Sequence, residues 1–429
     1  MNRRILHILT FLLIPLSAVA QNIKEERSVH QIILKEIKKD IQKNYYDPNF
    51  RGIDLEANYK KTSELIDNAA SSTEMSDLIG RFCLLLDDSH TIFSPPRKTY
   101  GVDYGWNLLL IDNKAFVTEI SEKSDAYKKG VRVGDQVYMI EGFIPNRSEF
   151  RTLMRHFNVM QPRRSLDILL VKPSGNKYKL DIAAEITENS KFLAPTRRDW
   201  ELEYQKYDAE YNRQIYYGKI PGLSILKMTS FDLSTIKVDK MIDKVEKNEA
   251  LILDLRGNRG GYNDALEQLV SNFFDREVDA GKIINRDGTK TFSIKSKGKK
   301  AYKGKLVVLI DNGSSSAAEI FARIVQLEKR GIVIGDQSAG AVMQSVYIPH
   351  SLGAGAVLFY GINMTIADLI MSDGQRLEKV GVTPDKKIFP TAQDLANKRD
   401  PVISRAAEIL GFKISPEEAG KIFNSEYKK

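Results

Sequence analysis

The chain has 429 residues, a length that exceeds one ordinary hydrophobic core and predicts two or three domains. Its hydrophobic content of 42% and charged content of 28% are typical of a globular protein. The formal net charge is +8, but no nucleic-acid-binding motif accompanies the basic residues, so we expect no nucleic-acid partner.

Residues 1–20 have the features of an export signal. Arg3 and Arg4 precede a short apolar stretch, residues 8–16, and Ala18-Val-Ala20 is a small-residue cleavage signal. No later segment approaches the about 20 consecutive apolar residues of a spanning helix. The sequence therefore predicts an exported protein, periplasmic or secreted, without a stable membrane span.

Residues 24–95 are expected to form an N-terminal helical domain. Val29, Ile33, Ile37 and Ile41 recur every four residues, which places them on one apolar helix face. A second helix is predicted for residues 73–86, ahead of the polar string Asp87-Asp-Ser-His90.

Residues 98–186 change to short strands and are expected to form a β domain. Apolar runs at 108–111 and 115–120 flank a short turn, and a hairpin is predicted over 166–182. Short helices are expected at residues 124–130 and 147–157.

The string from Ser124 to Gly142 in this domain resembles a PDZ domain. Tyr104-Gly105-Trp106-Asn107 then falls where PDZ domains place the backbone loop that captures a peptide carboxylate, so these four residues are peptide-binding candidates. The alternative is a module that only orients its neighbouring domain.

Strands and helices alternate after a polar linker at residues 187–213, which predicts an α/β domain with largely parallel strands over 214–390. Residues 391–429 are expected to form a C-terminal helical tail. The fold class is thus multidomain α/β.

Two strand–turn–helix corners in this domain carry the candidate chemistry. In the first, the apolar run 306–310 is followed by three serines, 314–316, and by a helix whose first N–H groups have no helical partner. Such N–H groups stabilise the oxyanion that forms when a serine attacks an acyl carbon. The alternative is that the serines only cap the helix.

The second corner contains Arg256-Gly-Asn-Arg-Gly-Gly261 between a strand and a helix. Its spacing fits neither phosphate-binding glycine motif. Adjacent Gly260 and Gly261 allow close approach of the backbone and can aim N–H groups at a substrate, so they are oxyanion-hole candidates together with the N–H of Ala317.

Four strings identify a family resemblance: residues 254–261, 314–319, 338–341 and 381–385. Their order is similar to that of the C-terminal-processing and tricorn-type serine peptidases, over about residues 30–390. The resemblance implies a crotonase/ClpP-like α/β-spiral protease domain and a peptidase activity.

The resemblance also implies a choice of catalytic base. C-terminal-processing members use a lysine at the position of Ala341 in this chain, whereas the tricorn-type branch uses serine and histidine with a second serine and a glutamate. Ser89-His90 and Glu378 match those positions, and Ser316 matches the nucleophile, three residues before Glu319.

We therefore expect an exported serine peptidase in which Ser316 attacks, His90 is the general base, and Ser89 with Glu378 positions that histidine. His350 is the rival base. The histidines lack metal-ligand spacing, so no metal and no cofactor are expected. The partner is a protein or peptide substrate, and a homo-oligomer is left open. The alternative function is a catalytically silent peptide-binding protein that uses the PDZ-like domain.

Overall fold

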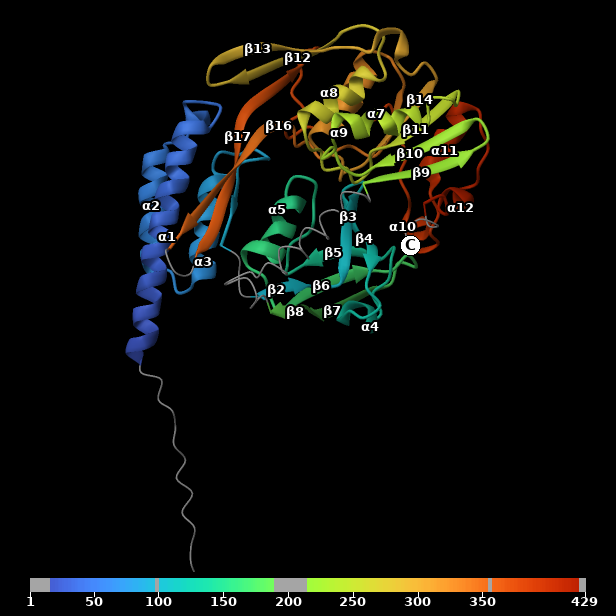
Figure 1. Cartoon of the computed structure of the whole chain (residues 1–429). Helices are drawn as coiled ribbons and strands as arrows, with labels where there is room; N and C mark the ends of the chain where they lie inside the picture. The colour runs from blue at the N-terminus through green and yellow to red at the C-terminus, as the bar shows by residue number, and fades with distance from the viewer. Residues whose placement is uncertain (1–15, 97–99, 189–213, 354–356, 424–429) are drawn as a thin grey trace, which may run out of the picture.

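The computed structural model describes residues 16–96, 100–188, 214–353 and 357–423 (Figure 1). Residues 1–15 of the predicted export signal and residues 189–213 of the predicted linker lie outside this range. Within the described part of the chain, none of the helices combines the length and apolar character needed to cross a membrane.

The N-terminal helices share a core with strands from much later in the chain. Ile33, Ile37 and Ile41 are fully buried, as the four-residue periodicity predicted. They pack against buried residues of β17 such as Ile362 and Met364. The elements of this layer are α1 (Leu16–Asn44), η1 (Phe50–Gly52), α2 (Leu55–Asn68), α3 (Ser72–Leu84), β16 (Met343–Leu352) and β17 (Leu358–Met371).

Strand β17 is the centre of a five-stranded antiparallel sheet. It pairs with β16 along one edge, and with β1 (Ile92–Ser94) and β12 (Val278–Asn285) along the other. β13 (Gly288–Ile294) extends the sheet beyond β12. Because β1 follows the Asp87–His90 string directly, its pairing with β17 brings that string to the sheet.

Residues 100–188 form a separate layer of antiparallel strands, which we call the strand module. Its sheet has the order β3-β4-β5-β6-β7, and β2 pairs with β8. Thr187 and Glu188 belong to β8, so the predicted linker begins two residues too early. A polar segment can still form a strand when its backbone pairs with a neighbouring strand, as β8 does with β2. The elements are β2 (Tyr100–Asp103), β3 (Trp106–Ile111), β4 (Lys114–Ile120), α4 (Asp125–Lys128), β5 (Gln136–Ile140), α5 (Phe150–Arg155), η2 (His156–Met160), β6 (Ser165–Val171), β7 (Lys177–Ala183) and β8 (Glu185–Glu188).

The remaining sheet has six strands in the order β18-β15-β14-β11-β10-β9, and neighbours pair in parallel except β9 with β10. This confirms the predicted α/β character with largely parallel pairing. The strands are β9 (Ile215–Ile220), β10 (Leu223–Met228), β11 (Ala250–Asp254), β14 (Lys305–Ile310), β15 (Ile332–Gly335) and β18 (Lys386–Lys387).

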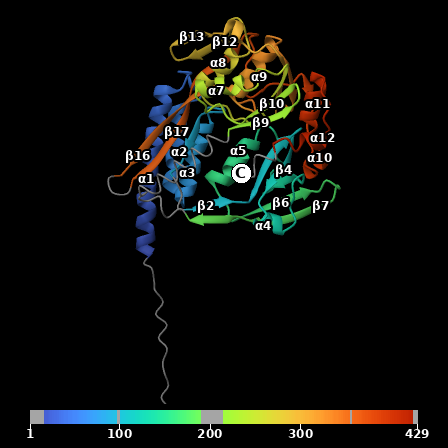
Figure 2. The ribbon, with the colours of Figure 1, turned by 45° about the vertical axis from the view of Figure 1, so that its right-hand side comes forward.

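Helices cover both faces of this sheet, which explains its continuous apolar strands. α7, α8 and α9 share one core with it, and α11 and α12 share another. Figure 2 shows the C-terminal helices beside β9 and β10, with the N-terminal helices on the opposite side of the molecule. The helices are α7 (Thr235–Asp243), α8 (Asn263–Ser271), η4 (Gly298–Lys300), α9 (Ala317–Leu327), α10 (Ala392–Ala396), α11 (Pro401–Leu410) and α12 (Pro416–Ala419).

Candidate active site

The two predicted corners meet at the carboxyl ends of two neighbouring strands of the six-stranded sheet. β11 and β14 are neighbouring parallel strands, so the loops that follow them lie side by side. We call residues 256–261 the glycine loop and residues 311–317 the serine corner. A Cβ added to Gly260 would lie 2.6 Å from Ser316 Cβ and 3.1 Å from Ser316 Oγ. The backbone of the glycine loop therefore contacts the Ser316 side chain directly.

Among the three serines of the corner, Ser316 is the accessible one. Ser314 and Ser315 are 0% and 7% exposed, whereas Ser316 is half-buried. The hydroxyl of Ser314 donates to the Leu255 carbonyl at 2.8 Å. Ser316 has φ 56° and ψ −121°, a conformation that residues other than glycine rarely adopt. Ser316 also occupies the N-cap position of α9 and forms a capping box with Glu319, so the predicted nucleophile and the capping alternative concern the same residue.

A buried carboxylate, Glu319, holds the corner in place. It accepts the N–H of Ser316 at 3.0 Å, the Ser338 hydroxyl at 2.6 Å, and the N–H groups of Gly340 and Ala341 at 2.7 and 2.9 Å. Burial raises the pKa of Glu319 to about 7 against the effect of these hydrogen bonds. With its acceptors occupied by structural donors, Glu319 acts as a brace.

Ser89, His90 and Glu378 form a hydrogen-bonded relay. Ser89 Oγ lies 2.7 Å from His90 Nδ1 and 2.8 Å from Glu378 Oε2, and the Ser89 N–H donates to Glu378 Oε1 at 2.8 Å. A hydroxyl has one proton. If Ser89 donates it to the carboxylate, Nδ1 of His90 must carry the proton that Ser89 Oγ accepts. Nε2 is then the unprotonated nitrogen, free to accept a proton elsewhere.

Burial keeps the His90 imidazole neutral over a wide pH range. Burial lowers the pKa of His90 to about 4, the positive charge of Arg151 adds to this effect, and the negative charge of Asp88 opposes it. Burial also raises the pKa of Glu378, against the N–H groups of Val342 and Ser89 that favour its charged form. A neutral imidazole is the form that a general base requires.

The turn that carries His90, residues 88–91, is fixed by the Asp88 carboxylate. Asp88 is 6% exposed. It accepts the His90 N–H at 2.8 Å, the Thr91 N–H at 2.6 Å, and the hydroxyls of Thr91 and Thr365 at 2.7 and 2.6 Å. Asn363 on β17 donates to the His90 carbonyl at 2.9 Å. We call residues 88–91 the histidine turn.

Residues 338–342 contact both the serine corner and the relay. The Ala341 carbonyl accepts the Ser316 N–H at 2.9 Å, and the Val342 N–H donates to Glu378 Oε2 at 2.8 Å. Ala341 is buried, with 1% of its surface exposed, so this position supplies no lysine base. This bridge segment, residues 338–342, thus links the Ser316 backbone to Glu378 of the relay through adjacent residues.

The three oxyanion candidates differ in whether their N–H is available. The N–H of Ala317, at the first turn of α9, and the N–H of Gly261 donate to no other residue in the described part of the chain. The N–H of Gly260 instead donates to Asn258 Oδ1 at 2.8 Å. The prediction of Gly260 as a donor is therefore revised: Gly260 contributes close approach to Ser316, because a side chain there would displace the serine.

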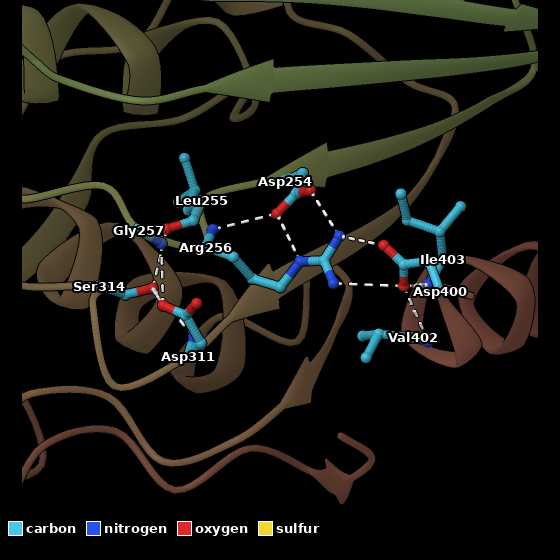
Figure 3. Close-up of polar contacts among 9 residues, drawn as sticks. All are labelled: Asp254, Leu255, Arg256, Gly257, Asp311, Ser314, Asp400, Val402 and Ile403. Carbon is cyan, nitrogen blue, oxygen red and sulfur yellow. Dashed lines mark hydrogen bonds and ion pairs between the residues drawn. The ribbon is translucent and has the colours of Figure 1, made fainter. Parts of the chain in front are cut away.

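The glycine loop is anchored on both sides by ion pairs and hydrogen bonds (Figure 3). Arg256 Nη2 lies 2.7 Å from Asp254 Oδ2 and 2.8 Å from Asp400 Oδ2, and Asp400 also caps the start of α11. The N–H of Gly257 donates to Asp311 Oδ1 at 2.8 Å. The loop is thus tied to its own strand, to the C-terminal helix α11 and to the serine corner.

Tyr104, a predicted peptide-binding residue, belongs to the core of the strand module. It is 3% exposed, and its hydroxyl donates to the Arg163 carbonyl at 2.9 Å. Its ring fills space that the apolar strands enclose, so contact with a peptide would come from the Tyr104 backbone and its binding role stays a prediction.

Acidic side chains accept two donors of the other residues in that loop, whereas the buried indole N–H of Trp106 has no hydrogen-bond partner among the described residues. Asp103 Oδ1 accepts the Gly105 N–H at 2.7 Å, and Glu119 Oε2 accepts the Asn107 side-chain amide at 2.6 Å. Trp106 pairs with β4. Two carboxylates beside these donors would repel the carboxylate of a peptide. Carboxylate capture at residues 104–107 therefore stays a prediction, which this electrostatic environment disfavours.

The rival base, His350, takes part in a different contact. Its Nε2 lies 2.6 Å from Asp40 Oδ2 on α1, and its ring stacks on Tyr360 with centroids 5.1 Å apart. It therefore connects α1 to β16. Among the described residues, histidine, cysteine and acidic side chains form no cluster suited to a metal ion.

Sequence reasoning did not identify Asp88 and Asn363 as supports of His90. For Asp88 a local signal exists, because aspartate accepts N–H groups two or three residues further along a turn. For Asn363 the contact depends on the pairing of β1 with β17, which no local pattern encodes.

Comparisons with known proteins show similarity to peptidases. Residues 222–388 match Peptidase family S41, and residues 29–83 match the Tricorn protease C1 domain. Putative tricorn protease homolog 2 of Streptomyces coelicolor is 25% identical over 86% of this chain and 31% of its own length. The carboxy-terminal processing protease CtpB of Bacillus subtilis is 25% identical over 64% of this chain and 52% of its own length.

The chain spans between a third and about half of the length of these curated relatives. Among solved structures, mature CPAF complexed with lactacystin has a similar fold, with a TM-score of 0.64 and 14% identity over 93% of this chain and 99% of that one. Residues 222–388 are thus similar to peptidase family S41 and follow a segment similar to the tricorn C1 domain, and the named relatives include serine proteases.

Proposed function

We propose that this protein is an exported serine peptidase of the tricorn-like branch, which hydrolyses peptide bonds through an acyl-enzyme on Ser316. The observation that carries the proposal is the Glu378–Ser89–His90 relay, with distances of 2.8 and 2.7 Å. A positioned carboxylate and hydroxyl that leave one imidazole nitrogen unprotonated are what activation of a serine requires.

In the proposed mechanism, Ser316 Oγ attacks the carbonyl carbon while His90 Nε2 accepts its proton. The N–H groups of Ala317 and Gly261 stabilise the oxygen that becomes negative. The imidazolium then donates its proton to the leaving nitrogen, and the C–N bond breaks. Water, deprotonated by the same nitrogen, hydrolyses the ester and returns Ser316 to its starting state.

The strand module, predicted over 98–186 as PDZ-like, has an orienting role in this proposal. Arg147, which precedes α5, donates to the Gln337 carbonyl at 2.8 Å and pairs with Asp336 at 3.0 Å. The N–H of Asp112 also donates to Asp336, at 2.9 Å. These contacts fix the module beside the bridge segment. Together with the acidic side chains of Asp103 and Glu119 at the 104–107 loop, they favour support of the catalytic domain, predicted over 214–390 with an α/β-spiral fold.

Labelling with a fluorophosphonate probe tests the proposal. We expect the probe to modify Ser316, identified by mass spectrometry of the tagged peptide, and to block cleavage of casein. Ser315→Ala should label normally, because Ser315 is buried. A folded wild-type protein that neither reacts with the probe nor cleaves casein would favour the catalytically silent peptide-binding protein instead.

A further inference from the structure

One face of the β16–β17 ribbon carries the histidine turn. In an antiparallel pair, residues directly opposite each other point to the same face. Thr365 pairs with Ser345 and Asn363 pairs with Tyr347, so these four side chains share a face. Thr365 donates to Asp88 and Asn363 to the His90 carbonyl. The turn therefore covers the Thr365–Asn363 end of that face.

The same face continues beyond the turn as exposed aromatic surface. Tyr347 is 52% exposed, and Phe359, four residues before Asn363 on β17, is 62% exposed. The opposite face of the ribbon is packed on the N-terminal helices, and its residues Ile362 and Tyr360 are 0% and 4% exposed. The fold thus buries one face of this ribbon and leaves aromatic side chains in water on the other.

The side chains that β16 and β17 themselves place on the exposed part of this face are uncharged, and part of it lies close to the backbone. Pro349 pairs with Gly361, and Ser351 pairs with Phe359. The Tyr347 side chain lies over Gly361, because a Cβ added to Gly361 would lie 2.6 Å from the Tyr347 hydroxyl. At a rise of about 3.4 Å per residue, the distance from Asn363 to Phe359 is about 14 Å, or about four residues of an extended chain.

We infer that this face binds an extended, uncharged and apolar segment of the peptide substrate, on one side of the bond that is cleaved. The inference rests on the proposed function and adds to it a class of substrate. Its basis is continuity: β17, which supports the histidine turn, also presents Phe359 to solvent, and its partner strand β16 presents Tyr347 on the same face. Exposed aromatic rings in a row beside a site are typical of recognition surfaces, because they supply apolar area with little loss of side-chain freedom.

The test compares two pairs of peptides, one pair for each side of the cleaved bond, and three proteins. A fluorogenic decapeptide is derived from a casein sequence that the wild type cleaves, with leucine or phenylalanine at the four positions on one side of the bond. Its partner carries serine at those positions, and the pair is made for each side. The proteins are the wild type, Tyr347→Ser/Phe359→Ser, and the control Ile236→Ser, which removes an apolar residue of α7 that is 66% exposed.

For one of the two sides, the wild type should cleave the apolar peptide with a KM about tenfold below that of the serine peptide, and the double variant should lose this difference. Ile236→Ser should keep it. All three proteins should react with the fluorophosphonate at the same rate, which shows that Ser316 is intact.

Equal KM values for both peptides in wild type and double variant, with normal fluorophosphonate labelling, would overturn this inference alone. A double variant that changes from a dimer to a monomer by light scattering, with unchanged KM, would assign the face to a second copy of the chain and also overturn it. Absence of both labelling and cleavage in the wild type would overturn the proposed function and this inference together.

Discussion

The serine corner and the loop at residues 104–107 both resemble sites where backbone N–H groups hold an anion, yet their surroundings differ. At the corner, the N–H of Ala317 keeps no partner among the described residues, and the nearby Glu319 is occupied by four structural donors. At the loop, Asp103 accepts the Gly105 N–H. Glycine and turn patterns indicate where a backbone bends, whereas neighbouring acidic side chains decide which donors remain available.

The largest effect that separates the two regions should come from Ser316→Ala. Loss of the nucleophile should lower kcat by about 10⁴-fold or more, without a change in thermal unfolding. Peptide cleavage and a melting curve measure the two outcomes. Ser314→Ala serves as the contrast, because its hydroxyl binds the Leu255 carbonyl and should affect stability instead. Full activity in Ser316→Ala would remove the corner from the chemistry.

The relay supplies the next test. In Glu378→Gln, the amide can donate to Ser89, which then donates to His90 Nδ1 and leaves the proton on Nε2. With the wrong tautomer, kcat should fall by about 10²- to 10⁴-fold while KM changes little. Steady-state kinetics give both values. Lys379→Ala, which removes an exposed ion pair with Asp87, is the control and should stay close to wild type.

Two glycine substitutions compare the regions directly. Gly260 has a φ of +85°, and the Cβ that Gly260→Ala adds would lie 2.6 Å from Ser316 Cβ. The variant should therefore displace Ser316 and lose activity. In Gly105→Ala, φ is +73° and the Cβ would lie 2.2 Å from Ser124 Cβ, so the strand module should be destabilised. Fluorophosphonate labelling should fail in the first and persist in the second below its melting temperature. The reverse pattern would contradict this assignment.

The pH dependence of kcat/KM tests the environment of His90. Because burial lowers the pKa of His90 to about 4, activity should persist well below the ordinary histidine value of 6.5 and fall only near pH 4. The lowered pKa also means that His90 favours the folded state above pH 6.5 and that this contribution is lost as the pH falls toward 4. In Asp88→Asn, loss of the negative charge should move the acid limb to still lower pH. A limb at 6.5 in the wild type would disagree with this environment.

The smallest effect is expected at the loop itself. Peptides with a free C-terminal carboxylate and their amidated counterparts should be cleaved with equal kcat/KM, because Asp103 and Glu119 engage the donors of the loop. A clear preference for the free carboxylate, lost in Asn107→Ala, would restore the predicted peptide-binding role.

Sequence reasoning identified the parts of the site that local chemistry encodes. The strand–turn–helix corners follow from apolar runs, glycines and helix starts, and the family resemblance selected Ser89, His90, Ser316 and Glu378. It could not choose between the N–H groups of Gly260 and Gly261, because the side chain of Asn258 decides that choice in three dimensions. It also could not foresee that β17 would complete the core of the N-terminal helices and hold the histidine turn, since this pairing joins distant segments.

The ion pair between Arg256 and Asp400 bears on how this protein can be divided for experiments. The match to the peptidase family ends at residue 388, whereas Asp400 and the apolar side of α11 lie beyond it. A chain truncated after 388 would leave the Arg256 guanidinium with one of its two carboxylates and would expose the sheet face that Val402, Ile403 and Ala406 cover. The minimal folding unit for expression therefore extends through α12, further than the family boundary suggests.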